Sequence, residues 1–348
     1  MRLKKHYFED IQLFRTTASL VWTILFLSLL AVLPFIIKTY YLSIANLMAL
    51  NVLVALGLNI LVGNTGQISL GHAGFVAIGA YATAFLLEFG MPFAVTLVLA
   101  GLIAALIGAL LGIPSLRLEG PYLAIATLAF GLAVLVIIGR MDIFGGRMGM
   151  VVPKIELGWT GLSYDVSLYY VFISITAAMV VSAYNILKSR VGRAFQAIRD
   201  SDVAASVIGV NLAYYKTLSF AISAFYAGVA GCLWALYLQF VSPGNFSFML
   251  SILFLATVVL GGLGSVTGSV MGGIVMTFLS IQLEKIVEVP ILGTLIVEFS
   301  NTFMNPSGIS NVKWVLTGLI LIAVILFEPL GLNGIWLRVK RYWNLWPY

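Results

Sequence analysis

The chain has 348 residues, of which 61% are hydrophobic and only 9% are charged, and its net charge is +6. Soluble domains carry about 25% charged residues, so this composition excludes a soluble enzyme, a nucleic-acid-binding module and a disordered chain. We expect an all-α, polytopic membrane protein that forms one transmembrane domain over residues 1–348.

Ten windows of the sequence contain no Asp, Glu, Lys or Arg. They are residues 17–37, 41–62, 67–87, 92–113, 122–139, 167–187, 217–240, 249–263, 265–283 and 314–327. A helix needs roughly 20 apolar residues to cross the hydrocarbon, and most windows are that long. The sequence therefore predicts about ten transmembrane helices. Because two of the windows are short, this number is defined to within one pair of helices.

The basic residues indicate the orientation of the chain. With ten crossings, 13 of the 19 Lys and Arg residues fall on the side that holds both termini. Cytoplasmic segments carry the excess of Lys and Arg, so residues 1–16 and the tail 330–348 are expected to be cytoplasmic in a bacterial or archaeal plasma membrane. We expect the positive charge to meet anionic lipid rather than nucleic acid. Residues 284–313 are predicted to form an outer insertion.

A glycine-rich polar segment, GNTGQISLGHAG, spans residues 63–74. Its four glycines weaken a continuous helix, and its polar side chains suit freed backbone groups. One interpretation is a translocation pathway or gate. The alternative is close packing of helices through small residues. For the histidine we favour this alternative, in which it packs between helices and forms hydrogen bonds. Both interpretations also apply to the junction at residues 261–264. The candidate pathway residues are Gln67, Ser69, Gly71, His72, Gly262 and Gly264.

The two glycine junctions lead into similar sequences. Leu70–Leu86 and Leu263–Leu279 match at five of 17 positions, and both are expected to run from the cytoplasm outward. This indicates a parallel internal repeat of spans one to three and seven to nine, with a chance match between common Gly and Leu residues as the alternative. Glycine-broken segments at matching positions point to a transport pathway. Asn46, Asn51 and Asn59 are expected to form interhelical hydrogen bonds rather than bind substrate.

No window contains an Asp, Glu, Lys or Arg, and the only histidine in a window is His72. Proton-driven carriers place such groups inside the membrane, so the driving force is expected to come from outside it. With one cysteine and two histidines, the chain offers neither an internal disulfide nor a His/Cys metal cluster. It also lacks a GxxxxGK[ST] phosphate loop. We expect no catalytic residues, no metal and no bound cofactor.

The segment 188–216 lies between the sixth and seventh windows and is expected to be a cytoplasmic coupling loop. Phe195 and Ile198 fall on one helical face, Asp200 or Ser201 suits the cap of a second short helix, and Gly209 suits its C-terminal end. These features predict a pair of short amphipathic helices that dock into a groove on a partner. The alternative is a juxtamembrane loop resting on anionic lipid.

Four stretches of the chain resemble a known family. They are ALGLNILVGNTGQISLGHAGFVAIGAYATAFL (55–86), RLEGPYLAIATLAFG (117–131), GRAFQAIRDSDVAASVIGVNLAYYKTLSFAISAFYAGVAG (192–231) and FEPLGLNGIW (327–336). The family is that of permease subunits of branched-chain amino acid ABC importers, of the LivM type. The resemblance implies four partners: a second, LivH-type permease, two cytoplasmic ATPases that use Mg-ATP, and an extracytoplasmic binding protein.

On this resemblance, the helices within 192–211 insert into an ATPase. The implied coupling residues are Arg193, Arg199, Asp200, Asp202 and Gly209. The sequence thus predicts a non-catalytic subunit that translocates Leu, Ile and Val by alternating access. Three alternatives stay open: a permease for urea or short-chain amides, a sodium-coupled secondary carrier, and a passive channel.

Overall fold

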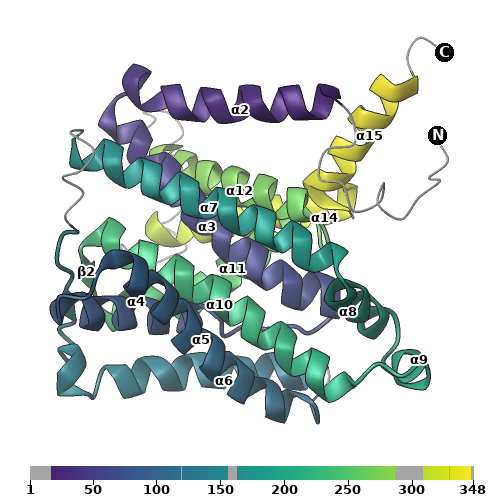
Figure 1. Cartoon of the computed structure of the whole chain (residues 1–348), viewed down its shortest axis with the longest axis horizontal. Coiled ribbons are helices and arrows are strands. Elements are labelled where there is room, and N and C mark those ends of the chain that lie inside the picture. The colour runs from purple at the N-terminus through teal and green to yellow at the C-terminus, as the bar shows by residue number, and fades with distance from the viewer. Residues whose placement is uncertain (1–16, 119, 156–162, 287–308, 329, 346–348) are drawn as a thin grey trace.

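A computed structural model describes residues 17–118, 120–155, 163–286, 309–328 and 330–345 (Figure 1). The expected cytoplasmic segment 1–16, most of the expected outer insertion 284–313 and the end of the tail lie outside the described residues. The regular secondary structure of the described part is helical apart from one antiparallel pair of two-residue strands, β1 (Met150–Val151) and β2 (Phe240–Val241).

Each of the ten uncharged windows contains a helix. In chain order these are α2 (Thr17–Ile36), α3 (Thr39–Leu58), α4 (His72–Glu88), α5 (Phe93–Ser115), α6 (Pro121–Ile138), α7 (Tyr164–Lys188), α10 (Leu212–Leu238), α11 (Phe248–Gly261), α12 (Val266–Ile286) and α14 (Ile309–Phe327). The shorter elements are η1 (Asn59–Gly63), η2 (Asp142–Phe144), α8 (Arg190–Asp200), α9 (Asp202–Val207), η4 (Pro243–Phe246) and α15 (Gly331–Leu345).

Six of the described helices are long and apolar enough to cross a membrane: α3 with η1, α5, α6, α7, α10 and α12. A seventh span results if α14 and α15 are taken together across a bend of 44°. This is fewer than the ten expected. Of the four helices not among the six, α4 has 17 residues and α11 only 14, whereas α2 has 20 and α14 has 19. A helix of 14 residues is about 21 Å long, against a hydrocarbon thickness of about 30 Å. The short window 249–263 had indicated the short α11, but the window 67–87 gave no sign of the short α4.

The lengths of α4 and α11 are limited by the residues just before α4 and just after α11. Residues 67–71 belong to an uncharged window but are not helical, so α4 begins only at His72. At α11 the helix ends because Gly262 has φ +111°, a backbone conformation open to glycine and unfavourable for other residues. The protein is therefore an all-helical polytopic membrane protein with six or seven candidate spans.

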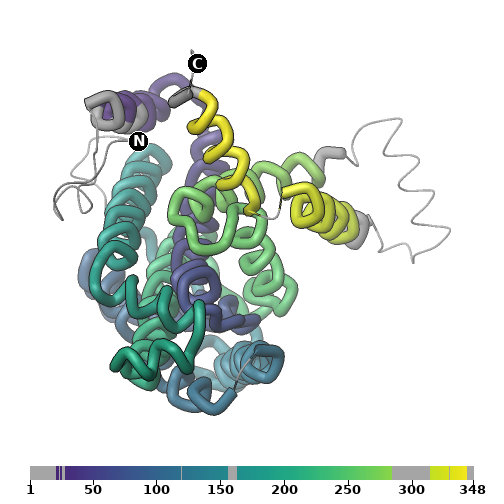
Figure 2. The backbone as a smooth tube through the Cα atoms, turned by 90° about the vertical axis from the view of Figure 1, so that its right-hand side faces the viewer, coloured from purple at the N-terminus to yellow at the C-terminus, as the bar shows by residue number. Residues whose placement is uncertain are grey.

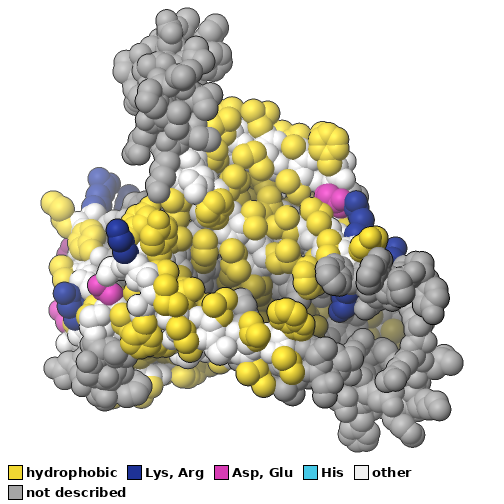
Figure 3. All heavy atoms as spheres, turned by 90° about the horizontal axis from the view of Figure 1, so that it is seen from above, with side chains coloured by type: hydrophobic (Ala, Val, Ile, Leu, Met, Phe, Trp, Pro, Cys, Tyr) yellow, Lys and Arg dark blue, Asp and Glu magenta, His cyan; other side chains and the backbone are white. Residues whose placement is uncertain are grey.

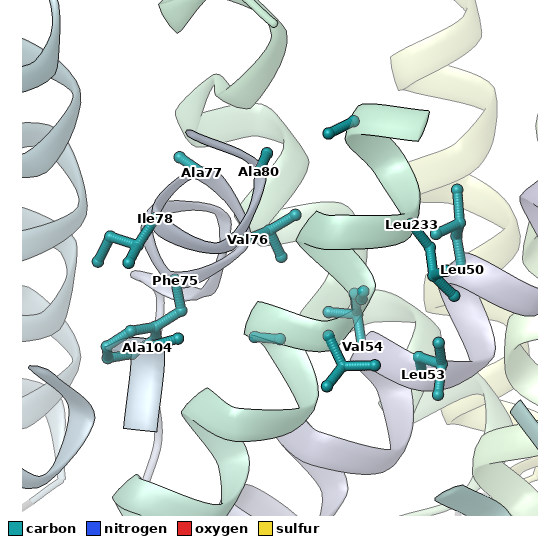
Figure 4. Packing of buried hydrophobic residues seen from close by; sticks show 14 of the residues in the cluster. Leu50, Leu53, Val54, Phe75, Val76, Ala77, Ile78, Ala80, Ala104 and Leu233 are labelled. Atoms are coloured by element: carbon teal, nitrogen blue, oxygen red, sulfur yellow. The ribbon is translucent and has the colours of Figure 1, made fainter. Parts of the chain in front are cut away.

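The core is built around α10, which packs against α3, α4 and α5. Figure 4 shows apolar side chains from these four helices converging, among them Leu53, Phe75 and Leu233. Small residues let the backbones approach closely. A Cβ on Gly79 of α4 would lie 2.2 Å from the Gly228 oxygen of α10, so a larger residue there would force the two helices apart.

The outer faces of the bundle carry exposed apolar side chains, chiefly on α2, α5, α6 and α14. Figure 3 shows one such face, with hydrophobic side chains across its middle and Lys and Arg side chains toward its two ends. This distribution is typical of a protein whose middle faces lipid tails and whose ends face headgroups and water.

The contacts between helices do not follow the grouping of spans that the sequence match predicted. In the structure α10 packs on α4 and α5, and α3 packs on α11 and α12. Figure 1 shows that α3 and α10, the two helices that make these contacts, run in opposite directions. A parallel repeat of spans one to three and seven to nine would make α2 equivalent to α10. Instead α2 lies at the edge against α7.

Candidate functional site

The predicted pair of short helices is present as α8 and α9, at one end of the bundle (Figures 1 and 2). Phe195 and Ile198 of α8 are both buried, as the helical spacing indicated. Ser201 provides the cap between the helices, because its Oγ accepts the backbone N–H of Ala204 at 3.2 Å. The local pattern of the sequence was therefore sufficient to predict these two helices.

The chain leaves α9 through a tight turn. Gly209 has φ +87°, the left-handed conformation that commonly ends a helix at glycine. Its N–H donates to the Ser206 oxygen at 3.0 Å, and the next N–H, that of Val210, donates to the Ala205 oxygen at 3.0 Å. This turn directs the chain into α10.

An ion pair fixes α9 to the bundle. Lys216 of α10 is buried, and its Nζ pairs with the carboxylate of Asp202 in the first turn of α9. Val203 and Val207 of α9, and Ile208 just after it, are exposed over most of their surfaces. The pair of helices therefore presents an apolar surface away from the protein while an ionic contact holds it from behind.

The five candidate coupling residues occupy different positions in this pair. Arg193 and Asp200 are exposed on α8, and the Arg193 guanidinium donates to the Lys188 oxygen at 3.4 Å. Gly209 and Asp202 shape and hold α9, as described above. Only Arg199 reaches the glycine junctions.

Arg199 bridges two segments that are far apart in the sequence. Its Nη1 donates to the Gly63 oxygen at 2.6 Å, where η1 ends. The same nitrogen lies 2.7 Å from the position that a Cβ would take on Gly264, in the turn between α11 and α12. A Cβ on Gly66 would lie 3.8 Å from the Cα and Cγ of Arg199. The side chain thus contacts both glycine junctions at once.

Asn59 joins the same two segments from inside the bundle. Its Nδ2 donates to the Ser265 oxygen at 2.9 Å, and its Oδ1 accepts the Gly264 N–H at 2.8 Å. The expected interhelical role is therefore confirmed for Asn59. It is also confirmed for Asn51, whose Nδ2 donates to Thr277 Oγ1 at 2.7 Å.

Close approach explains the glycine at the end of η1. A Cβ on Gly63 would lie 2.0 Å from Asn59 Oδ1 and 2.4 Å from the Gly264 nitrogen. Both distances are far inside van der Waals contact, so any side chain at this position would separate the two junctions. The sequence showed the glycines but not that Asn59 and Arg199 hold them together, because those contacts are long-range.

Gly262 lies on another side of the α11–α12 turn. A Cβ on this residue would lie 2.4 Å from the Leu330 oxygen, just before α15. The two glycine candidates of this turn therefore contact different neighbours: Gly264 lies against Arg199, and Gly262 lies against the entry to α15.

Within the first junction, His72 is completely buried and belongs to a hydrogen-bonded chain. Ser223 Oγ donates to the Gly57 oxygen at 2.6 Å, so it accepts from His72 Nε2 at 2.7 Å. The other ring nitrogen, Nδ1, must then accept from Ser69 Oγ at 3.1 Å. These contacts support the packing interpretation of His72 and Ser69.

Gly71 and Gln67 are also enclosed by neighbouring helices. A Cβ on Gly71 would lie 2.1 Å from the Thr127 oxygen of α6. Gln67 is buried, and its Oε1 lies 3.4 Å from Ser219 Oγ, whose proton is donated to the Lys216 oxygen at 2.7 Å. Its Nε2 has no hydrogen-bond partner among the described residues. A buried polar atom without a partner costs about 1–3 kcal/mol, which makes Gln67 the least satisfied residue of the junction.

The site holds no constellation for chemistry on a bound substrate. Within the part of the chain that the structure describes, no group of three or more His, Cys, Asp or Glu side chains could hold a metal ion. What the arrangement offers is a mechanical connection. Through the Arg199 side chain, α8 is linked both to the end of η1 and to the α11–α12 turn.

Comparison with known proteins places the chain in a family. The family described as "Branched-chain amino acid transport system / permease component" matches residues 40–325. The high-affinity branched-chain amino acid transport system permease protein LivM of Escherichia coli strain K12 is 37% identical over 269 residues, covering 70% of this chain and 63% of that protein. LivM of Salmonella typhimurium is also 37% identical, over 258 residues, covering 67% of this chain and 61% of that protein.

The second permease of that system is similar over a shorter region. LivH of Escherichia coli strain K12 is 34% identical over 99 residues, covering 28% of this chain and 32% of that protein. The chain thus spans just under two thirds of the length of the LivM relatives that it matches. No solved structure matches the chain significantly.

Proposed function

The chain belongs to the permease family of branched-chain amino acid transport systems, and on that premise we propose that it is the translocation subunit of an ATP-driven importer of Leu, Ile and Val. It hydrolyses nothing itself. Two cytoplasmic ATPases bind Mg-ATP, a LivH-type permease pairs with this subunit, and an extracytoplasmic binding protein delivers the substrate. The similarity to LivH supports a partner of the same fold.

The observation that carries the proposal is the contact of Arg199 with both glycine junctions. In the proposed mechanism the exposed apolar side of α9 docks on an ATPase, and closure of the ATPases displaces α8 and α9 together. Because Arg199 is hydrogen-bonded to the end of η1 and lies against Gly264, this displacement changes the angle between α3 and α12. Alternating access follows from that change.

The composition of the spans supports an uncharged, aliphatic cargo. None of the ten windows contains a carboxylate, a lysine or an arginine, so a passage through them offers no fixed charge to a zwitterionic amino acid. The names of the LivM relatives point to the same substrate class. A permease for urea or short amides is the alternative within this family's chemistry.

We also place both termini in the cytoplasm, in a bacterial or archaeal plasma membrane. In Figure 1 the start of α2 and the whole of α15 lie toward the end of the molecule that holds α8 and α9. The excess of Lys and Arg on that side supports the orientation. Ten crossings result if α2, α4, α11 and α14 are counted with the six long spans.

The test is transport by the assembled complex in proteoliposomes. With the ATPases, the second permease and the binding protein present, labelled leucine should accumulate only when ATP is supplied, and unlabelled isoleucine should compete whereas urea should not. If urea competes and isoleucine does not, the substrate is urea or a short amide and not a branched-chain amino acid. If this chain alone accumulates leucine under a sodium gradient, it is a sodium-coupled carrier. If leucine only equilibrates across the membrane, the chain is a passive channel.

A further inference from the structure

The last described helix, α15, has one basic and one apolar face. Between Gly331 and Leu345 it contains Arg338, Lys340 and Arg341 and no acidic residue. At 100° per residue, Leu332, Ile335, Trp336, Val339 and Tyr342 fall on one side of the helix. Asn333, Lys340 and Arg341 fall on the other. This pattern is typical of helices that lie in a membrane interface.

Beyond Leu332, which packs against the bundle, much of the apolar face of α15 is exposed among the described residues. Ile335 is 44% exposed, Trp336 48%, Val339 42% and Tyr342 68%. Within the part of the chain that the structure describes, the first turn of α15 packs closely on the bundle through Gly331, and the helix then extends toward the edge of the molecule (Figure 1). Four large apolar side chains on a basic helix would therefore face water unless lipid covers them.

The direction of α15 separates it from the preceding span. The axis turns by 44° between α14 and α15, so α15 does not simply continue the crossing. Arg338 pairs with Glu328 across this bend, which uses one of the three positive charges. Lys340 and Arg341 stay exposed for an external anion.

We propose that α15 is an interfacial helix that binds anionic phospholipid headgroups through Lys340 and Arg341 and buries its apolar face among the acyl chains. The positive charge of Lys340 and Arg341 favours an anionic lipid over a zwitterionic one at this face. A cytoplasmic leaflet is negatively charged, and each Lys or Arg held near it strengthens binding about fivefold. A zwitterionic surface would satisfy the apolar face but would leave the basic face without a specific ligand.

The attachment of α15 gives this contact a mechanical consequence. A Cβ on Gly331 would lie 2.6 Å from the Leu260 oxygen at the end of α11. Thr267 Oγ1 of α12 donates to Asn333 Oδ1 at 3.2 Å. The α11–α12 turn is thus held by α15 on one side and by Arg199 on the other, so a lipid-bound α15 fixes one side of the turn to the membrane surface.

The first experiment measures where the two faces of α15 lie. The full chain, with the buried Cys232 replaced by Ala, carries an environment-sensitive fluorophore at Val339→Cys or at Leu337→Cys and sits in nanodiscs of phosphatidylcholine and phosphatidylglycerol. Lipids spin-labelled in the acyl chain should quench the label at position 339 several-fold more strongly than the label at position 337. Equal quenching at both positions, or quenching of both only by aqueous iodide, would overturn the proposal.

The second experiment tests the charge. Headgroup-matched spin-labelled phosphatidylglycerol should quench the label at position 339 more strongly than spin-labelled phosphatidylcholine. In Lys340→Gln/Arg341→Gln this preference should fall to near equality. The matched control, Arg140→Gln/Arg147→Gln, removes the same charge from the opposite end and should keep the preference. A preference that survives in the α15 variant would overturn the headgroup assignment. Because neither readout involves transport, failure here is distinct from failure of the proposed function.

Discussion

Gly264→Ala tests the contact between Arg199 and the α11–α12 turn directly. Gly264 has φ +82°, and a Cβ there would lie 2.7 Å from Arg199 Nη1. The backbone conformation alone should cost about 1–2 kcal/mol for alanine. Displacing Arg199 from the Gly63 oxygen should remove a charged hydrogen bond worth about 2 kcal/mol. We expect a total loss of about 3–4 kcal/mol in the free energy of unfolding.

A matched glycine separates the two contributions. Gly90 has φ +74°, and no described atom lies within 4 Å of its Cβ position. Gly90→Ala should therefore cost only the backbone strain, about 1–2 kcal/mol. In an Arg199→Ala background, Gly264→Ala should also cost only about 1–2 kcal/mol, since the hydrogen bond is already gone.

The assay is equilibrium unfolding of the full chain in mixed micelles of increasing SDS fraction, followed by tryptophan fluorescence. The four chains wild type, G264A, R199A and the double variant form a double-mutant cycle with an expected coupling of about 2 kcal/mol. Purely additive losses would refute the contact. So would a G90A loss as large as that of G264A.

Three further substitutions test the packing around the site. Asn59→Ala should lower the free energy of unfolding by about 2–3 kcal/mol because it breaks two interhelical hydrogen bonds. Asn46→Ala, at a side chain whose Oδ1 has no partner in the described chain, should cost less than half as much in the same micelles. Gly79→Ala should prevent correct folding, as reported by gel filtration, because its Cβ would lie 2.2 Å from the Gly228 oxygen. Gly318→Ala, with no described atom within 4 Å, should behave as wild type. His72→Leu should destabilise the protein but keep leucine uptake per folded molecule, whereas abolished uptake in stable protein would make His72 a gate.

The sequence predicted features that are determined locally. The buried positions of Phe195 and Ile198 follow from helical periodicity, and the roles of Ser201 and Gly209 follow from the chemistry of helix ends. Similarly, each uncharged window contains an apolar helix of the described structure. The 15-residue window 249–263 indicated a short helix at α11. The window 67–87 did not reveal that α4 is short, since a window counts apolar residues whether or not the backbone stays helical.

What the sequence could not show is which distant segments meet. Arg199 is separated from Gly63 by 136 positions, and nothing in the local pattern of either segment specifies the other. The role of Asn59 was recognised only in general terms, because a polar residue in a span has many partners available. The parallel repeat of 70–86 and 263–279 stays a prediction, since five matches between common residues do not specify which helices meet.

The central claim is that Arg199 transmits ATPase movement to the two glycine junctions, and coupled transport by the assembled complex tests it most directly. Leucine taken up per ATP hydrolysed should fall at least tenfold in Arg199→Ala, while hydrolysis itself continues. The control is Arg190→Ala, which removes an exposed arginine from the same helix and should keep the wild-type ratio. An unchanged ratio in Arg199→Ala, with the protein folded and the complex intact, would contradict the mechanism.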